Sequence, residues 1–137
     1  MKILQINVVN KILSTGRNVA EMNNYFEEKG NICATAYSKG PSTDPESEFV
    51  IGSSLDVKVH ALLSRLFGKQ GYFSFSSTRK LLKFMDDFAP DIVVLNNLHG
   101  NYINLPMLLE YLAKKNAGLE NKKQYFGIMA DNWIYTF

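Results

Sequence analysis

The sequence opens with Met1-Lys-Ile-Leu-Gln-Ile-Asn-Val-Val9, and this stretch decides the fold class. Its aliphatic residues, several of them β-branched, are too few for a core helix and predict a strand buried on both faces. Such a strand lies in the interior of a parallel sheet. The next segment, Asn10-Lys-Ile-Leu-Ser-Thr-Gly-Arg17, leads into a helical pattern. A buried strand followed by a helix predicts an α/β protein.

The step Ser14-Thr15-Gly16-Arg17 predicts an anion site at the start of that helix. A hydroxyl of Ser14 or Thr15 could cap the helix, and Gly16 lacks a Cβ, so free backbone N–H groups could approach a ligand closely. Arg17 would add a charge-assisted hydrogen bond to a phosphate. One glycine makes no dinucleotide fingerprint, and no Gly-Lys-Ser/Thr follows to make a P-loop. The alternative is a plain helix cap.

The rest of the chain alternates predicted helices and strands. Apolar spacings of three and four predict the helices, and short β-branched or aromatic runs predict the strands. We expect helices at 17–29, 56–67, 76–88 and 105–115, the third capped by Ser76 or Ser77, and further strands at 31–38, 49–51, 91–95 and 125–129. This order predicts a Rossmann-like open parallel sheet of about five strands with helices on both faces, as one domain over residues 1–137.

The apolar stripes of two predicted helices indicate which residues face inward. In the helix at 76–88, the residues expected to face inward are Leu81, Leu82, Met85 and Phe88. In the helix at 56–67, the residues at core spacing are Val59, Leu62, Leu63 and Leu66, with Lys58 and Arg65 outside. Basic residues beside apolar and aromatic ones continue from His60 to Phe75, and Arg79, Lys80 and Lys83 follow. This mixture predicts peripheral contact with an anionic membrane face, and the alternative is ordinary helix packing with a solvated basic side.

Ligands of open parallel sheets bind beyond the carboxyl ends of the strands, and three segments are expected to converge there, at 10–17, 96–104 and 130–136. In the second, His99 could act as a general base or hydrogen-bond a sugar hydroxyl. Amides suit polyhydroxylated ligands because each donates and accepts, and this segment holds Asn96, Asn97, Asn101 and Asn104. In the third, Asp131 and Trp133 could orient a ligand. The alternative is turn-forming asparagines, a solvent-exposed histidine and a strand end.

Composition limits the function classes. The net charge is +2, with 46% hydrophobic and 20% charged residues, which is ordinary for a globular protein and shows no nucleic-acid signature. Cys33 is the single cysteine, so we expect no disulfide and a reducing cytoplasm. His60 and His99 lie far apart and form no metal motif, so no metal is predicted. His60 is expected to pack between helices or to lie at the flank of a helix.

Four segments together resemble the N-terminal domain of family-4-like glycosyltransferases of bacterial capsule and lipopolysaccharide synthesis. They are the first strand with Ser14 to Arg17, the Leu55 to Phe67 helix, the strand Pro90-Asp91-Ile-Val-Val-Leu95, and Asn97-Leu-His-Gly-Asn-Tyr-Ile-Asn104, the most specific. The resemblance covers nearly the whole chain and implies the GT-B fold, in which two Rossmann-like domains face each other across a cleft. The first domain binds the acceptor and the second the nucleotide sugar, usually without a metal or another cofactor.

The resemblance implies a role for each matched residue. Ser14, Thr15, Gly16 and Arg17 would lie near the donor phosphates, and His99 and Asp131 would be catalytic. The acceptor side would be lined by Asn97, Gly100, Asn101, Tyr102, Asn104 and Trp133. Two positions depart from the family pattern, because Asn96 replaces one histidine and Ala130 replaces the histidine of a His-Asp-x-Trp motif.

We therefore expect an acceptor-side half, inactive alone, whose partners are a nucleotide sugar, a glycan or lipid-linked acceptor and a second domain or partner chain. The alternative is a non-catalytic, flavodoxin-like binding or regulatory module. A receiver domain would need an acidic cluster after the first strand, where Asn7 and Asn10 stand. A dinucleotide-binding protein would need three glycines after that strand and an acid after the second, where Ser38 and Lys39 stand.

Overall fold

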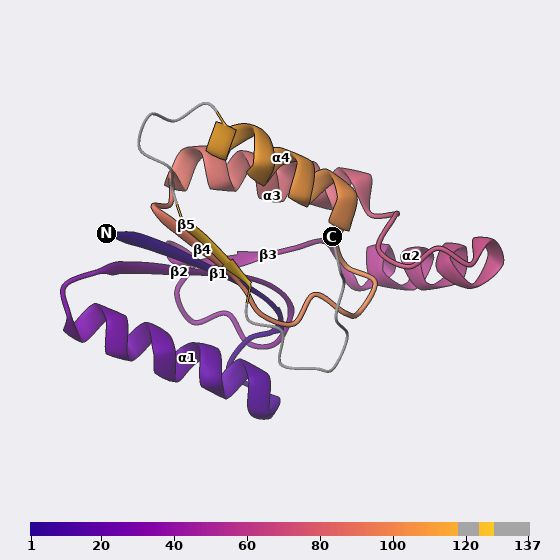
Figure 1. Cartoon of the computed structure of the whole chain (residues 1–137). Coiled ribbons are helices and arrows are strands. Elements are labelled where there is room, and N and C mark those ends of the chain that lie inside the picture. The colour runs from indigo at the N-terminus through magenta and orange to yellow at the C-terminus, as the bar shows by residue number, and fades with distance from the viewer. Residues whose placement is uncertain (118–123, 128–137) are drawn as a thin grey trace.

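The computed structural model describes residues 1–117 and 124–127 as an open parallel sheet with helices around it (Figure 1). Strands are β1 (Lys2–Val9), β2 (Ile32–Lys39), β3 (Glu48–Val50), β4 (Ile92–Leu95) and β5 (Gln124–Gly127). Helices are α1 (Leu13–Glu28), α2 (Ser54–Phe67), α3 (Phe75–Phe88) and α4 (Leu105–Ala117). The strand order is β3-β2-β1-β4-β5, and every pairing is parallel. The predicted Rossmann-like sheet is confirmed.

The first strand lies in the middle of this sheet, as its sequence predicts. β1 pairs with β2 on one side and with β4 on the other. Leu4 and Ile6 are completely buried, as are the polar side chains of Gln5 and Asn7. The chain adds β2 and β3 in one direction and then β4 and β5 in the other, so the strand order reverses between β1 and β4.

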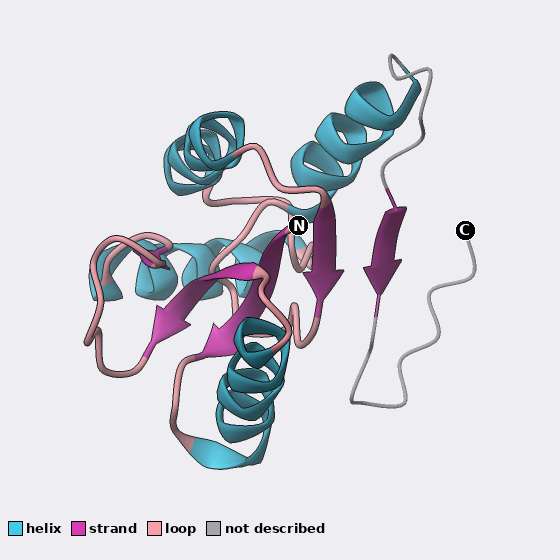
Figure 2. Ribbon diagram, turned by 90° about the vertical axis from the view of Figure 1, so that its left-hand side faces the viewer, coloured by secondary structure: helices cyan, strands magenta, loops and turns pink. Residues whose placement is uncertain are grey.

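The two faces of the sheet differ in chemistry. Helices α3 and α4 cover one face, where Leu81, Met85 and Leu108 join the larger apolar core (Figure 2). Helix α1 covers the other face, where a row of hydrogen bonds replaces part of the apolar packing. Asn23 of α1 donates to Thr35 of β2 at 2.8 Å and accepts from Gln5 of β1 at 2.6 Å. Gln5 in turn accepts from the Asn96 amide at 3.1 Å.

The predicted capping hydroxyls are wrong for two helices. The N-cap of α1 is Ile12, so Ser14 and Thr15 lie within its first turn. The N-cap of α3 is Ser74, so Ser76 and Ser77 lie within that helix. Neither N-cap side chain accepts a hydrogen bond from the first turn of its helix. The chain instead turns into each helix through a residue of positive φ, Leu13 at 57° and Ser74 at 63°.

The predicted inward face of α2 is also wrong. Val59, Leu62 and Leu66 are exposed, Leu63 is partly buried, and the buried residues of this helix are His60 and Ser64. The reason is position, because α2 lies beyond the carboxyl ends of the strands rather than over a face of the sheet (Figure 1). None of the helices in the described part of the chain is long and apolar enough to cross a membrane.

Candidate functional site

The carboxyl ends of β1 and β4 bring two of the three predicted segments together. The Asn96 N–H donates to Ile6 O at 2.9 Å, and the Asn97 N–H donates to the side chain of Asn7 at 3.2 Å. Segment 96–104 therefore begins beside the last residues of β1, from which segment 10–17 continues, at the point where the strand order reverses. This is the usual ligand position in open parallel sheets. The third segment, with Ala130, Asp131 and Trp133, lies outside the described residues.

The loop after β1 is anchored to the segment between β2 and β3. The Asn10 N–H donates to Lys39 O at 2.8 Å, and its side chain donates to Pro41 O at 3.0 Å. A Cβ on Gly40 would lie 2.3 Å from Asn10 O, so only glycine fits this approach. These contacts give the first loop a defined shape.

Lys11 supports the same anchor through an ion pair. Its Nζ lies 2.5 Å from a carboxylate oxygen of Glu48, whose side chain is almost completely buried. Burial opposes ionisation of this carboxylate, but hydrogen bonds from Lys11 and from the Thr43 and Asp44 N–H groups prevail and lower the pKa of Glu48 to about 2. Lys11 is therefore engaged in an ion pair, whereas Arg17, in the second turn of α1, is exposed.

Gly16 serves helix packing. It is buried, and a Cβ there would lie 3.0 Å from Lys11 N and 3.2 Å from Val9 Cγ2. The missing Cβ thus lets the first turn of α1 approach the end of β1. No side chain caps this helix and no acid stands in its first turn, while Ser14 and Arg17 are exposed. An anion site at this turn stays a prediction, with Ser14, Thr15 and Arg17 as its side chains.

The loop after β4 is held by its own hydrogen bonds. The Asn97 side chain accepts from the His99 N–H at 2.9 Å, and the Asn97 carbonyl accepts from the Tyr102 hydroxyl at 2.9 Å. Gly100 has φ 123°, and a Cβ there would lie 2.7 Å from Val8 Cγ2. The loop therefore folds back against β1. His99 is half-buried and lies between Asn97 and Gly100, which these contacts hold in place.

Three residues predicted to bind an acceptor hold the protein together instead of facing an open edge. Tyr102 is almost completely buried, and this burial raises the pKa of its hydroxyl. Asn104 is buried, accepts from the Met107 N–H at 3.0 Å and so caps α4, and donates to Tyr72 O at 2.6 Å. Asn101 accepts from the Ser64 hydroxyl at 3.3 Å. Sequence cannot separate these roles, because amides that bind sugars and amides that fix loops are the same residue type.

Sequence reasoning missed a polar cleft of about 170 Å³ beside α1. Its lining includes Asn23, Asn24, Cys33, Thr35 and Glu48. The signal was present, since Gln5 and Asn7 alternate along an otherwise apolar strand and predict polar partners on one face. Burial raises the pKa of Cys33 to about 11, so its thiol stays protonated at neutral pH and is a poor nucleophile.

The residues that the structure describes contain no group of three or more His, Cys, Asp or Glu side chains that could hold a metal ion. Comparison with protein-family models, with curated proteins and with solved structures returns no match. The geometry at the carboxyl ends of β1 and β4 is therefore the basis for a functional proposal.

Proposed function

We propose that this chain is the acceptor-side domain of a glycosyltransferase, acting on a nucleotide sugar and a glycan or lipid-linked acceptor. One observation supports this most directly. The first turn of α1 and the loop after β4 each have a glycine that allows close approach, and they pack against consecutive residues at the end of β1: Gly16 lies against Val9, and Gly100 against Val8. These two segments thus straddle the strand end at the position where open parallel sheets bind ligands.

Each loop would have its own task in the proposed enzyme. The free N–H groups of the first turn of α1, with Arg17, would bind phosphate oxygens of the donor. His99 would hydrogen-bond or deprotonate an acceptor hydroxyl, with the neighbouring Asn97 and Gly100 lining the acceptor position. Asn101, Tyr102 and Asn104 would keep the second loop in shape. Asp131 and Trp133 remain proposed contributors.

The opposite wall of the cleft would come from a second Rossmann-like domain or a partner chain that holds the nucleotide. Much of the rate of group transfer comes from positioning the two reactants, so one wall alone is expected to give no turnover. Stabilisation of the leaving phosphate by N–H groups and Arg17 would replace a metal. The proposal includes a cytoplasmic location, which fits the unpaired Cys33.

The test is an NMR titration of the labelled chain with two kinds of probe. Methyl glycosides of glucose, galactose and N-acetylglucosamine should shift the amides of His99 and Gly100, whereas inorganic phosphate should shift those of 14–17. His99→Ala should abolish the sugar response alone, and Arg17→Ala the phosphate response alone. Arg79→Ala, which changes an exposed arginine of α3, is the matched control and should change neither.

Two results would contradict the proposal. Sugars that shift only the opposite end of the strands, around Gly30 and Asp91, would move the site away from the switch point. Turnover of UDP-glucose by this chain alone would show that no second wall is needed. A response of the first loop to a flavin or nucleotide, with no response to sugars, would favour the flavodoxin-like binding module.

A further inference from the structure

Helix α2 presents its most apolar side away from the protein. Leu55, Val59, Leu62 and Leu66 are 67, 47, 57 and 68% exposed. Their spacings of four, three and four residues place them in one stripe along the helix, since each residue adds about 100° of rotation. His60 and Ser64, which are buried, lie on the opposite side. The outward stripe is therefore a continuous apolar surface.

The body-facing side of α2 is held by specific contacts, so the outward direction of the stripe is defined. His60 Nδ1 lies 2.6 Å from the Ser74 hydroxyl and shares a hydrogen bond with it, and the His60 ring meets Phe73 edge-on at 5.6 Å. The Ser64 hydroxyl donates to Asn101 at 3.3 Å. Val57 packs against the main core. Rotating the helix to bury the stripe would break all of these contacts.

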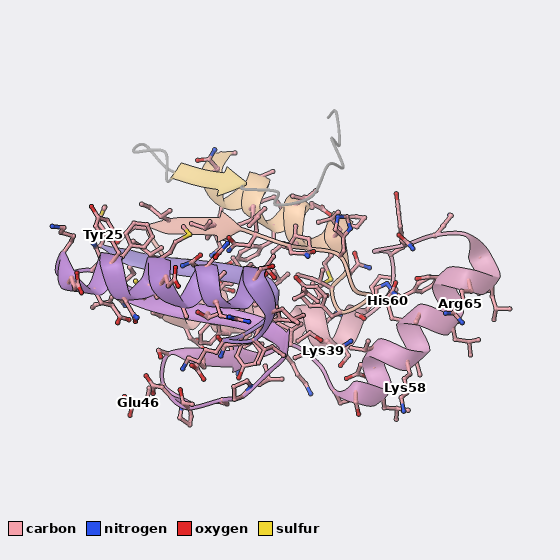
Figure 3. The ribbon with its side chains drawn as sticks, turned by 90° about the horizontal axis from the view of Figure 1, so that it is seen from below. Tyr25, Lys39, Glu46, Lys58, His60 and Arg65 are labelled. Carbon is pink, nitrogen blue, oxygen red and sulfur yellow. The ribbon has the colours of Figure 1, made fainter. Side chains whose placement is uncertain are left out.

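Basic residues flank the stripe. Figure 3 shows Lys58 and Arg65 on α2 directed away from the rest of the molecule, whereas His60 lies where the helix meets it. Lys69 follows the helix, with its Nζ 5.7 Å from the ring centroid of exposed Tyr72. The one acid of α2, Asp56, is engaged in a capping box with Ser53. The outward side of α2 is therefore apolar along the stripe and positively charged beside it.

The apolar area continues past the end of the helix. Phe67 is 65% exposed, and Tyr72 and Phe75 of the following segment are more than half exposed. Aromatic residues of this kind suit the boundary between lipid headgroups and acyl chains. We call the outward residues of α2, from Leu55 to Phe67 with Lys58 and Arg65, together with Lys69, Tyr72 and Phe75, the α2 outer surface.

We propose that the α2 outer surface docks on an anionic lipid bilayer, with α2 lying in the plane of the headgroups. A helix of 14 residues is about 21 Å long, which suits an interfacial position. Leu and Phe side chains enter the acyl boundary, while Lys and Arg extend to lipid phosphates. The positive flank selects an anionic bilayer over a neutral one, since each Lys or Arg near such a surface adds to binding.

This docking goes beyond the proposed sugar site and does not depend on it. The α2 outer surface and the proposed sugar site are nevertheless close together. The segment after α2 accepts hydrogen bonds at Gly71 O from the Leu105 N–H at 2.7 Å and at Tyr72 O from the Asn104 side chain at 2.6 Å. Docking through α2 therefore holds the carboxyl edge of the sheet next to the membrane.

The experiment is sedimentation of the chain with two kinds of vesicle. One is pure phosphatidylcholine, and the other is an equal mixture of phosphatidylcholine and phosphatidylglycerol. We expect binding to the anionic vesicles that weakens as salt is added. Leu62→Asp with Leu66→Asp should weaken binding by at least about tenfold. Lys58→Gln with Arg65→Gln should weaken it by roughly fivefold for each charge removed.

The matched control is Tyr25→Asp, which changes an exposed aromatic residue of α1, the helix on the face of the sheet opposite α3 and α4. It should bind anionic vesicles as the unchanged chain does, and circular dichroism should show that all variants are folded. Failure to bind anionic vesicles at low salt would overturn the proposal, as would unchanged binding by the Leu62 and Leu66 variant. A dimer in solution that Leu62→Asp dissociates would also overturn it and assign the surface to a second copy of the chain.

Discussion

Helices α2 and α3 are equal in length, at 14 residues each, and both carry an apolar stripe. The two stripes nevertheless face opposite environments. In α3 the stripe faces the sheet, with Leu81 completely buried and Met85 nearly so. In α2 the stripe faces away, and the helix attaches through His60 and Ser64. An apolar stripe thus shows that one side of a helix seeks a non-aqueous surface, without showing that this surface belongs to the same domain.

The largest expected difference between the two helices is in stability. Leu81→Ala removes a completely buried side chain of α3 and should lower the free energy of unfolding by about 2–5 kcal/mol. Leu62→Ala is the same substitution at an exposed site of α2 and should change it by less than about 0.5 kcal/mol. Urea denaturation of both variants measures this directly. A cost above about 2 kcal/mol for Leu62→Ala would show that the α2 stripe is buried in solution.

The buried histidine of α2 should make stability depend on pH. Burial lowers the pKa of His60, so the unfolded chain binds a proton more readily than the folded chain below about pH 6.5. Stability should therefore be complete above that pH and fall below it, by up to about 1.4 kcal/mol per pH unit. Unfolding in urea at several pH values from 8 to 5, with pH as the only variable, gives this slope.

His60→Leu should remove that part of the slope, while His99→Gln should retain it. Helix α3 has no histidine, so the effect belongs to the attachment of α2. An unchanged slope in His60→Leu would mean that this histidine is accessible to water, and the contrast between the two helices would then be weaker than the structure indicates.

The smallest expected effect concerns how the two helices end. Both C-caps have left-handed backbone, with φ 64° at Gly68 of α2 and φ 51° at Ala89 of α3. Gly68→Ala should destabilise by about 1 kcal/mol, although nothing lies within 4 Å of the new Cβ. Ala89→Gly should stabilise by a similar amount, because glycine adopts this conformation without strain. Thermal melts that gave both substitutions the same sign would contradict this account.

The sheet and the better part of the helices could be predicted from sequence. The run from Ile3 to Val9 predicts a central strand, and the spacing of Leu81 and Met85 predicts the inner side of α3 correctly. Both signals depend on local composition, which the chain carries wherever it folds. The caps of α1 and α3 could not be predicted in this way, since the chain enters both helices through a residue of positive φ, Leu13 or Ser74, which the capping pattern of the sequence does not indicate.

Part of the candidate site could also be predicted from sequence and part could not. The order of the predicted elements suggests the strand order, and the strand order brings segments 10–17 and 96–104 to the same edge of the sheet. That Asn101, Tyr102 and Asn104 turn inward does not follow, because their partners are Ser64, Asn97 and Tyr72. Two of these three partners lie about thirty or more residues away in sequence. Hydrogen-bond capacity is visible in a sequence, but the choice of partner is not.

The sequence by itself determined the class of this protein. Aliphatic runs of strand length between helical patterns have few ways to bury their surface other than an open parallel sheet between helices. Only the tertiary structure decided which side of α2 is exposed, since that depends on where the chain leaves β3 relative to the sheet. The same structure decided which amides hold the loops. Burial of a side chain is a property of its neighbours in space, and those neighbours come from the whole chain.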